Sequence, residues 1–124
     1  MDFISTSKAP QAIGPYSQAV VCHGFLYTSG QIALDPVSME MVSDDIEDQI
    51  KQVLQNLAAV LKEAGVSKKQ VVKVNIFLAN MDDFNKVNAI YADFFEGHKP
   101  ARSTVEVAAL PKNAQIEIDF VVKL

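Results

Sequence analysis

The alternation of apolar and polar residues predicts strands near both ends of the chain and helices between them. Residues 2–6, 17–22 and 25–29 form short strand-like runs, and His23-Gly24 between the last two is a plausible tight turn. Residues 8–15, which hold two prolines and a glycine, are expected to form a loop. The first part of the chain is therefore predicted to contain one short strand and a hairpin.

A helical period begins after the loop marked by Asp35-Pro36. Apolar residues then recur at spacings of three and four and predict one helix over 45–64, which ends at Gly65. The acidic residues at its start have two interpretations, a capping pair of Asp44 with Glu47 or a metal site. Capping is favoured because adjacent carboxylates on a helix point in different directions and no histidine lies nearby. The apolar stripe comprises Ile46, Ile50, Val53, Leu54, Leu57, Leu61 and Ala64.

Residues 71–78 alternate strongly and predict a central strand with one apolar face, formed by Val72, Val74, Ile76 and Leu78. Asp82 or Asp83 is then expected to cap a second helix that ends near Gly97. The stripe of this helix is aromatic and is interpreted as core: Phe84, Val87, Tyr91 and Phe94.

The last part of the chain predicts two more strands, one within 101–107 and one over 115–122, joined as a hairpin by Leu110-Pro111-Lys112-Asn113-Ala114. In the first, Arg102, Thr104 and Glu106 share one face because side chains alternate across a strand. In the second, Glu117 and Asp119 lie opposite the isoleucines.

The elements follow one another as three strands, a helix, a strand, a helix and two strands. This order predicts an α+β fold in which two helices cover one face of a mixed sheet. The other sheet face is only partly polar, so a homo-oligomer is expected. The length of 124 residues suits a single domain over 1–124.

Composition removes several classes of function. A net charge of −4, with no basic cluster larger than Lys68-Lys69, argues against a nucleic-acid partner. No stretch is apolar for the roughly 18 residues of a membrane span. The single Cys22 allows no internal disulfide, and no signal peptide is evident at Met1, so a soluble cytoplasmic protein is expected.

No cofactor fingerprint is present either. The glycines are scattered, and His23, His98 and Cys22 lack metal-ligand spacing, so neither zinc nor a nucleotide is expected. Arg102 is the first candidate for gripping an anion because its planar fork of donors matches a carboxylate or phosphate. The alternative is a solvated strand arginine without a ligand.

Several motifs in order resemble the RidA branch of the YjgF/RidA family over nearly the whole chain. They are Ile13-Gly14-Pro15-Tyr16-Ser17-Gln18-Ala19, Ser29-Gly30-Gln31-Ile32, the run from Pro100 to Ala108, Leu110-Pro111, and Ile116-Glu117-Ile118. The resemblance implies a chorismate-mutase-like fold, a homotrimer with ligand clefts between subunits, and no cofactor. It also implies an enamine/imine deaminase that converts 2-aminoacrylate-type, 2-iminobutanoate and 2-iminopropanoate intermediates to 2-keto acids and ammonia.

The same resemblance assigns site residues. Arg102 matches the arginine that binds the substrate carboxylate, Glu117 the glutamate that positions or activates water, and Tyr16 a tyrosine at the site. Ser29 and Gly30 match a strand end whose backbone faces the pocket. For Tyr16 the other interpretation is a ring that is buried for packing alone.

Two further positions are matched. Asn88 corresponds to a residue near the cleft, or is a surface amide without a role, and Thr104 stands where many relatives have cysteine. Threonine keeps a hydrogen-bonding group but no thiol, so the activity cannot require a thiol here.

The expected hairpin register would put Glu117 opposite position 107, roughly 17 Å from Arg102 at strand rise. The two residues are therefore expected to meet across a subunit boundary and not within one chain. The alternative function is a module that binds a 2-keto acid and regulates a partner protein without turnover. A ribonuclease activity, which the acidic balance disfavours, and a chaperone role are further alternatives.

Overall fold

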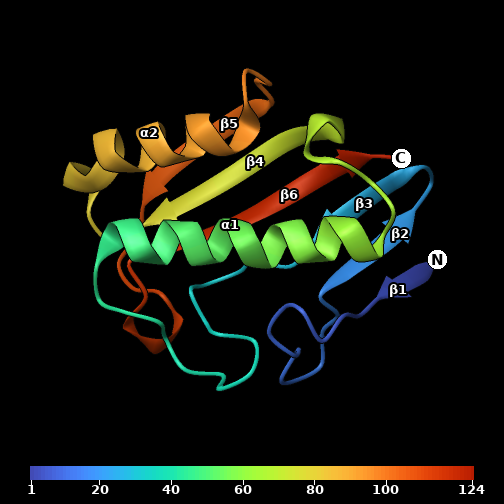
Figure 1. Ribbon diagram of the computed structural model, residues 1–124, viewed down its shortest axis with the longest axis horizontal. Helices are drawn as coiled ribbons and strands as arrows, with labels where there is room; N and C mark the ends of the chain where they lie inside the picture. The colour runs from blue at the N-terminus through green and yellow to red at the C-terminus, as the bar shows by residue number, and fades with distance from the viewer.

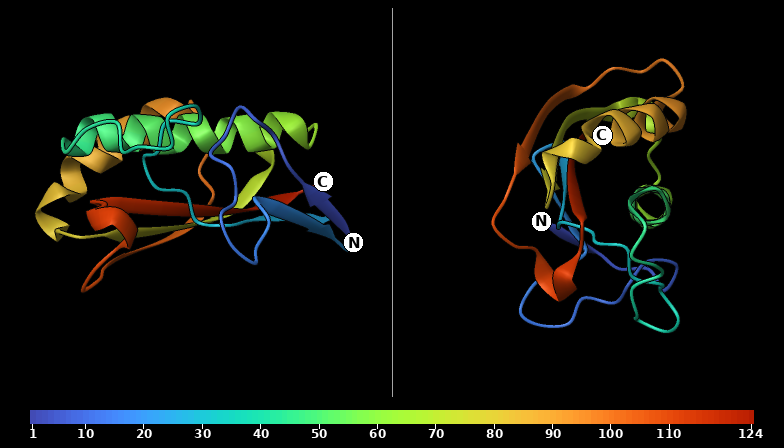
Figure 2. Two further views of the ribbon diagram at one scale, coloured as in Figure 1. Left: turned by 90° about the horizontal axis from the view of Figure 1, so that it is seen from below. Right: turned by 90° about the vertical axis from the view of Figure 1, so that its left-hand side faces the viewer.

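Two α-helices lie against one face of a six-stranded sheet in the computed structural model, which describes residues 1–124 (Figure 1). The side views in Figure 2 show both helices on the same side of the sheet. The order of strands and helices predicted from the sequence is confirmed. The elements are β1 Asp2–Ile4, β2 Ala19–Cys22, β3 Phe25–Thr28, α1 Ile46–Glu63, β4 Val71–Leu78, α2 Phe84–Phe95, β5 Ala101–Glu106 and β6 Ile116–Lys123, with 3₁₀ turns η1 Lys68–Gln70, η2 Met81–Asp83 and η3 Pro111–Asn113.

The strand order is β1-β2-β3-β6-β4-β5, and it contradicts the predicted hairpin between the last two strands. β6 pairs antiparallel with both β3 and β4, whereas β5 lies at the outer edge and pairs parallel with β4. The reason is the crossover through α2, which returns the chain to run beside β4 in the same direction. β6, which is buried along one whole face, then fills the central place between β3 and β4.

Helix α1 buries the predicted stripe except for Ala64, which is the half-buried C-cap residue, and it also buries Val60, which was not predicted. Its cap differs from the predicted pair of Asp44 with Glu47. Asp45 is the N-cap, and its carboxylate accepts a hydrogen bond of 3.0 Å from the backbone N–H of Asp48.

Helix α2 follows Asp83, which holds the N-cap position but makes no capping hydrogen bond with its side chain. The buried residues are Val87, Tyr91 and Phe95, while Phe94 is only half-buried. The ring of Phe95 packs against Phe120 of β6 with centroids 5.8 Å apart, which joins the helix to the sheet.

One predicted core residue of β4 faces the other way. A register shift between Val71 and Lys73 turns Val72 outward, where it is 42% exposed, and buries Val71 instead. Such a bulge reverses the alternation for the residue before it. Val74, Ile76 and Leu78 are buried as predicted.

The two sheet faces carry different candidate residues. Isoleucines 116 and 118 of β6 point toward the helices, so Glu117 and Asp119 lie on the open face. On β5, Arg102 and Thr104 are in register with the buried Val74 and Ile76 and therefore share the helix-covered face. Large apolar side chains on the open face remain accessible, among them Phe3, Tyr27 and Val105. Neither helix is long and apolar enough to cross a membrane.

Candidate functional site

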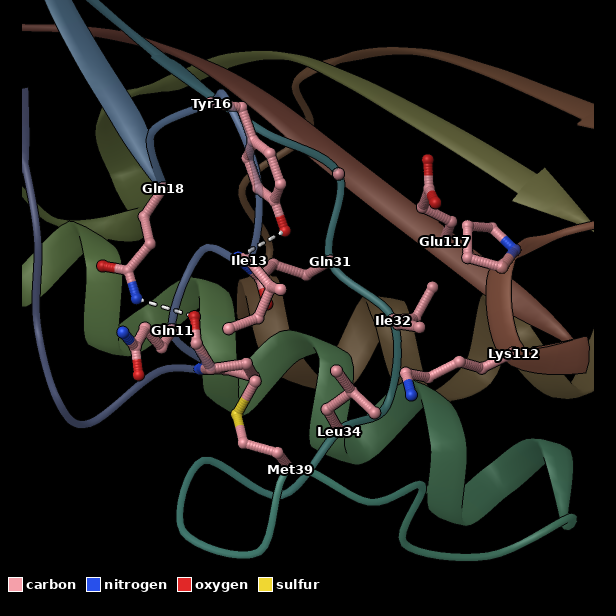
Figure 3. Close-up of a pocket in the computed structure, with 13 residues that line it drawn as sticks. Gln11, Ile13, Tyr16, Gln18, Gln31, Ile32, Leu34, Met39, Lys112 and Glu117 are labelled. Atoms are coloured by element: carbon pink, nitrogen blue, oxygen red, sulfur yellow. Dashed lines mark hydrogen bonds between the residues drawn. The ribbon is translucent and has the colours of Figure 1, made fainter.

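A cavity of about 430 Å³ lies between the loop that precedes β2, the segment after β3 and the start of β6 (Figure 3). Polar side chains at its wall come from three distant parts of the sequence. Apolar side chains fill much of the rest. The lining residues are Pro10, Gln11, Ile13, Tyr16, Gln18, Gly30, Gln31, Ile32, Leu34, Met39, Pro111, Lys112 and Glu117.

Glu117 supplies the carboxyl group of this cavity. Partial burial and the negative charge of Asp119 raise the pKa of Glu117, in that order of importance. Burial also raises the pKa of Asp119, although the amide of Asn75 donates a hydrogen bond of 2.9 Å to its carboxylate. No lysine or arginine forms an ion pair with Glu117. The carboxyl is therefore suited to exchange a proton closer to neutral pH than an exposed glutamate.

The backbone at Gly30 lies very close to the Glu117 carboxyl group. A Cβ atom at position 30 would lie 2.5 Å from Oε2 and 2.8 Å from Cδ of Glu117. The backbone of Gly30 is not left-handed, so a larger residue there would conflict with the Glu117 side chain and not with the backbone conformation. A Cβ-free residue at position 30 thus permits the close approach of backbone and carboxyl.

We expect Gly30→Ala to displace the Glu117 carboxylate, because the added methyl group would overlap its Oε2 and Cδ atoms. The crowding should also lower the free energy of unfolding by about 1–3 kcal/mol. Denaturant titration of Gly30→Ala in the wild-type and Glu117→Ala backgrounds provides the control. The methyl group should destabilise only the protein that retains Glu117, and an equal loss in both would contradict this account.

Tyr16 and Ser29 belong to the same region but play different parts. The ring of Tyr16 is 54% exposed at the cavity, and its phenol oxygen has only one weak contact, a hydrogen bond of 3.4 Å from the Ile13 N–H. The phenol is thus free to bind a ligand. Ser29 does not line the cavity. Its hydroxyl donates a 2.5 Å hydrogen bond to the carbonyl of Ser17, which ties the loop carrying Tyr16 to the end of β3.

Gln18 is a residue that the sequence did not reveal as important. Its side chain is buried and bonds to the backbone of the preceding loop, accepting from the Thr6 N–H at 2.7 Å and donating to the carbonyls of Thr6, Ala9 and Pro10. Figure 3 shows one of these hydrogen bonds, from the Gln18 amide. These bonds shape the outer wall of the cavity. Gln18 belongs to the motif from Ile13 to Ala19 that carries the family resemblance, but neither the motif nor its place beside β2 indicates these hydrogen-bond partners.

Arg102 lies in a second location, on β5 beneath α2. The guanidinium carbon is 4.8 Å from the ring centroid of Tyr91 and 5.6 Å from that of Phe84. No carboxylate pairs with Arg102. A small hollow of about 260 Å³ opens beside it, lined in part by His98, Lys99 and Pro100. Arg102 is therefore a stacked cation without an anionic partner, not a freely solvated strand arginine.

Asn88 and Thr104 accompany Arg102. Asn88 lies on the same face of α2 as Phe84 and Tyr91, from which it is four and three residues away. The Thr104 hydroxyl is buried and has no hydrogen-bond partner. The sequence-predicted site residues thus divide into two groups, one around Glu117 and one around Arg102.

The two groups do not meet within one protomer. Arg102 is in register with Val74 and Glu117 with Phe77, so three residues and two strand spacings, about 14 Å in all, separate their backbones. This separation replaces the distance of roughly 17 Å that was expected from the incorrect hairpin register. Their side chains also point to opposite faces of the sheet and line different cavities.

Metal ligation has no support in the arrangement of side chains. No group of three or more histidine, cysteine, aspartate or glutamate residues is placed to hold an ion. Cys22 is unpaired and half-buried in β2.

The sequence of this chain matches a known family model and several named proteins. The family model described as Endoribonuclease L-PSP matches residues 6–124. The human protein named 2-iminobutanoate/2-iminopropanoate deaminase is 50% identical over 118 residues, which are 95% of this chain and 86% of the human one.

Solved structures of related proteins have the same fold as this chain. A Yersinia pestis protein of the conserved Rid protein family has a TM-score of 0.97 and 51% identity, with 99% of this chain and 98% of that chain covered. The Escherichia coli protein TdcF, solved with bound serine, has a TM-score of 0.95 and 37% identity, with 100% and 99% covered.

Proposed function

This chain belongs to the RidA branch of the YjgF/RidA family, whose family model is described as Endoribonuclease L-PSP, and we propose that it is an imine deaminase. The reaction adds water to the C=N carbon of a 2-imino acid and releases ammonia, which leaves a 2-keto acid. An enamine such as 2-aminoacrylate enters after tautomerisation to its imine. The substrates are then 2-iminopropanoate, 2-iminobutanoate and related compounds.

The main observation in support of this proposal is the environment of the Glu117 carboxyl group. Its carboxyl is half-buried against Gly30, has a raised pKa, and opens into a cavity large enough for a short imino acid. As a carboxylate it accepts a proton from the attacking water, and as a carboxylic acid it returns the proton to the departing nitrogen. A group that performs both steps benefits from a pKa nearer to neutrality.

Arg102 provides the other requirement of the reaction, a grip on the substrate carboxylate. Its guanidinium has no protein carboxylate to compete for it, and a bidentate pair with a ligand fixes the orientation of the imine carbon. Asn88 and Thr104 stand beside Arg102 as further polar groups. Tyr16 offers its phenol at the Glu117 cavity.

A complete site then requires two copies of the chain. Arg102 of one protomer approaches the Glu117 cavity of its neighbour, since the two groups lie on opposite sheet faces of one protomer. Apolar side chains on the open face, such as Tyr27 and Val105, offer surface for such an association. A homotrimer with three equivalent intersubunit sites satisfies this requirement, because a head-to-tail contact with a rotation of about 120° closes into a ring of three.

The test couples a serine or threonine dehydratase to this protein and follows keto-acid formation while semicarbazide competes for the imine. We expect the protein to accelerate the release of pyruvate or 2-oxobutanoate above the spontaneous rate. Without added protein, the semicarbazone should dominate. Activity without added cofactor is part of the expectation.

The outcome that contradicts the proposal is a folded oligomer that binds 2-oxobutanoate but does not accelerate hydrolysis. Such a protein would be a 2-keto-acid-binding regulatory module that acts on a partner without turnover. Binding measured by calorimetry alongside the coupled assay separates these two functions.

A further inference from the structure

Two aromatic rings on α2 enclose the guanidinium of Arg102. Phe84 and Tyr91 stand seven residues apart and therefore on one face of the helix, two turns from each other. The guanidinium carbon of Arg102 lies 4.8 Å from the centroid of the Tyr91 ring and 5.6 Å from that of Phe84. Both distances are within the range of an attractive cation–π contact.

These rings stack against the Arg102 head group. Its guanidinium forms no ion pair with a protein carboxylate. Stacking occupies the flat face of a guanidinium and leaves its N–H groups, which lie at the edge, available to another partner. The rings therefore orient Arg102 without consuming the donors that a carboxylate needs.

The hydroxyl of Tyr91 is not what holds its ring in place. Tyr91 is only 8% exposed, and its hydroxyl oxygen is buried without a hydrogen-bond partner. Burial raises the pKa of this hydroxyl, and the positive charge of Arg102 opposes that rise only in part, so the hydroxyl stays neutral. The ring itself is anchored by Phe95, at a centroid distance of 4.8 Å. The aromatic face, not the phenol, is the functional part of Tyr91.

We propose that Tyr91, with Phe84, is a positioning residue that holds Arg102 ready for the carboxylate of the ligand. This inference rests on the proposed role of Arg102 in the imine deaminase. It makes a specific distinction among substitutions of Tyr91, because the ring should matter and the hydroxyl should not. It also predicts an effect on ligand binding more than on the chemical step.

The experiment measures the Kd of 2-oxobutanoate by calorimetry, with KM and kcat from the coupled assay, on the full-length oligomer. Tyr91→Leu removes the aromatic face and should raise Kd and KM about tenfold with kcat changed less than about threefold. Tyr91→Phe retains the face and should leave both constants within about twofold of wild type. Phe84→Leu, at the longer distance, should weaken binding about threefold.

Phe94→Leu is the matched control. It removes a ring from the same helix, but one that contacts Lys68, Phe95 and Phe120 instead of Arg102, so it also controls for loosening of the Phe95 ring that anchors Tyr91. It should leave Kd unchanged. Should Tyr91→Leu fail to fold, Phe84→Leu provides the same comparison from a half-buried position.

Three results would overturn the inference. The first is an unchanged Kd in Tyr91→Leu, or in Phe84→Leu if Tyr91→Leu does not fold. The second is a loss of binding in Tyr91→Phe equal to that in Tyr91→Leu, and the third is an equal loss in Phe94→Leu. Failure of the proposed function has a different signature. In that case the wild-type protein does not accelerate imine hydrolysis, and the calorimetric comparison still decides whether the rings position Arg102 for a carboxylate.

Discussion

Replacing Arg102 by alanine should lower kcat/KM for imine hydrolysis about 1,000-fold, the largest effect expected in this protein. The substitution removes the one cation that is stacked, unpaired and adjacent to a cavity. Without it, the carboxylate of the substrate has no bidentate partner and the imine carbon is not oriented toward water. Kinetics with 2-iminobutanoate generated by threonine dehydratase measure the loss.

Arg102→Lys tests whether charge alone is sufficient. An ammonium cannot form the paired donors of a guanidinium, so this variant should regain only part of the activity. Lys86→Ala is the matched control. Lys86 is exposed on α2, and its substitution removes one positive charge at a position away from the Tyr91 face of the helix. Wild-type kinetics in Arg102→Ala, with the fold intact, would exclude the proposed grip on the carboxylate.

Replacing Glu117 by glutamine should reduce kcat about 100- to 1,000-fold while binding of 2-oxobutanoate is nearly retained. Glutamine fits the space beside Gly30 but cannot accept or return a proton. The contrast with Arg102→Ala is that the loss should fall on kcat and not on ligand affinity. Parallel calorimetry and coupled kinetics separate the two constants.

The pH dependence provides an independent check on Glu117. Its pKa is raised by burial and by the charge of Asp119, so activity that needs the carboxylate should rise with pH through this raised value. Asp119→Asn removes the negative charge but can still accept the hydrogen bond from Asn75. The rise in activity should then move to lower pH, since the pKa of Glu117 falls. An unchanged profile would mean that another group titrates.

The sequence predicted the helices and strands well, but it did not predict correctly which strands pair in the sheet. The stripe of α1 and the alternation of β6 determine which side of each element is buried, because burial of apolar surface dominates folding. Alternation does not determine which strands pair. The two last strands, adjacent in the chain, are separated in space by β4, since the crossover through α2 sends β5 to the edge of the sheet.

The site was predictable only as a set of residue types. Motif resemblance pointed to Arg102 and Glu117, but their assignment to opposite sheet faces depends on the register with β4. The structural reason for Gly30 is equally long-range, because its contact is with Glu117 of a distant strand. Tyr91 was interpreted as core from its stripe, and it is buried, yet its stacking with Arg102 has no local signal.

The most direct measurement is complementation between two inactive variants. Arg102→Ala and Glu117→Ala chains are unfolded, mixed in equal amounts and refolded together, or are produced together in one cell. If each site combines Arg102 of one protomer with Glu117 of the next, about a quarter of the sites in a randomly assembled ring regain both residues, and activity should reach about that fraction of wild type. Activity no greater than the sum of the two variants alone, in oligomers shown to contain both chains, would contradict an intersubunit site.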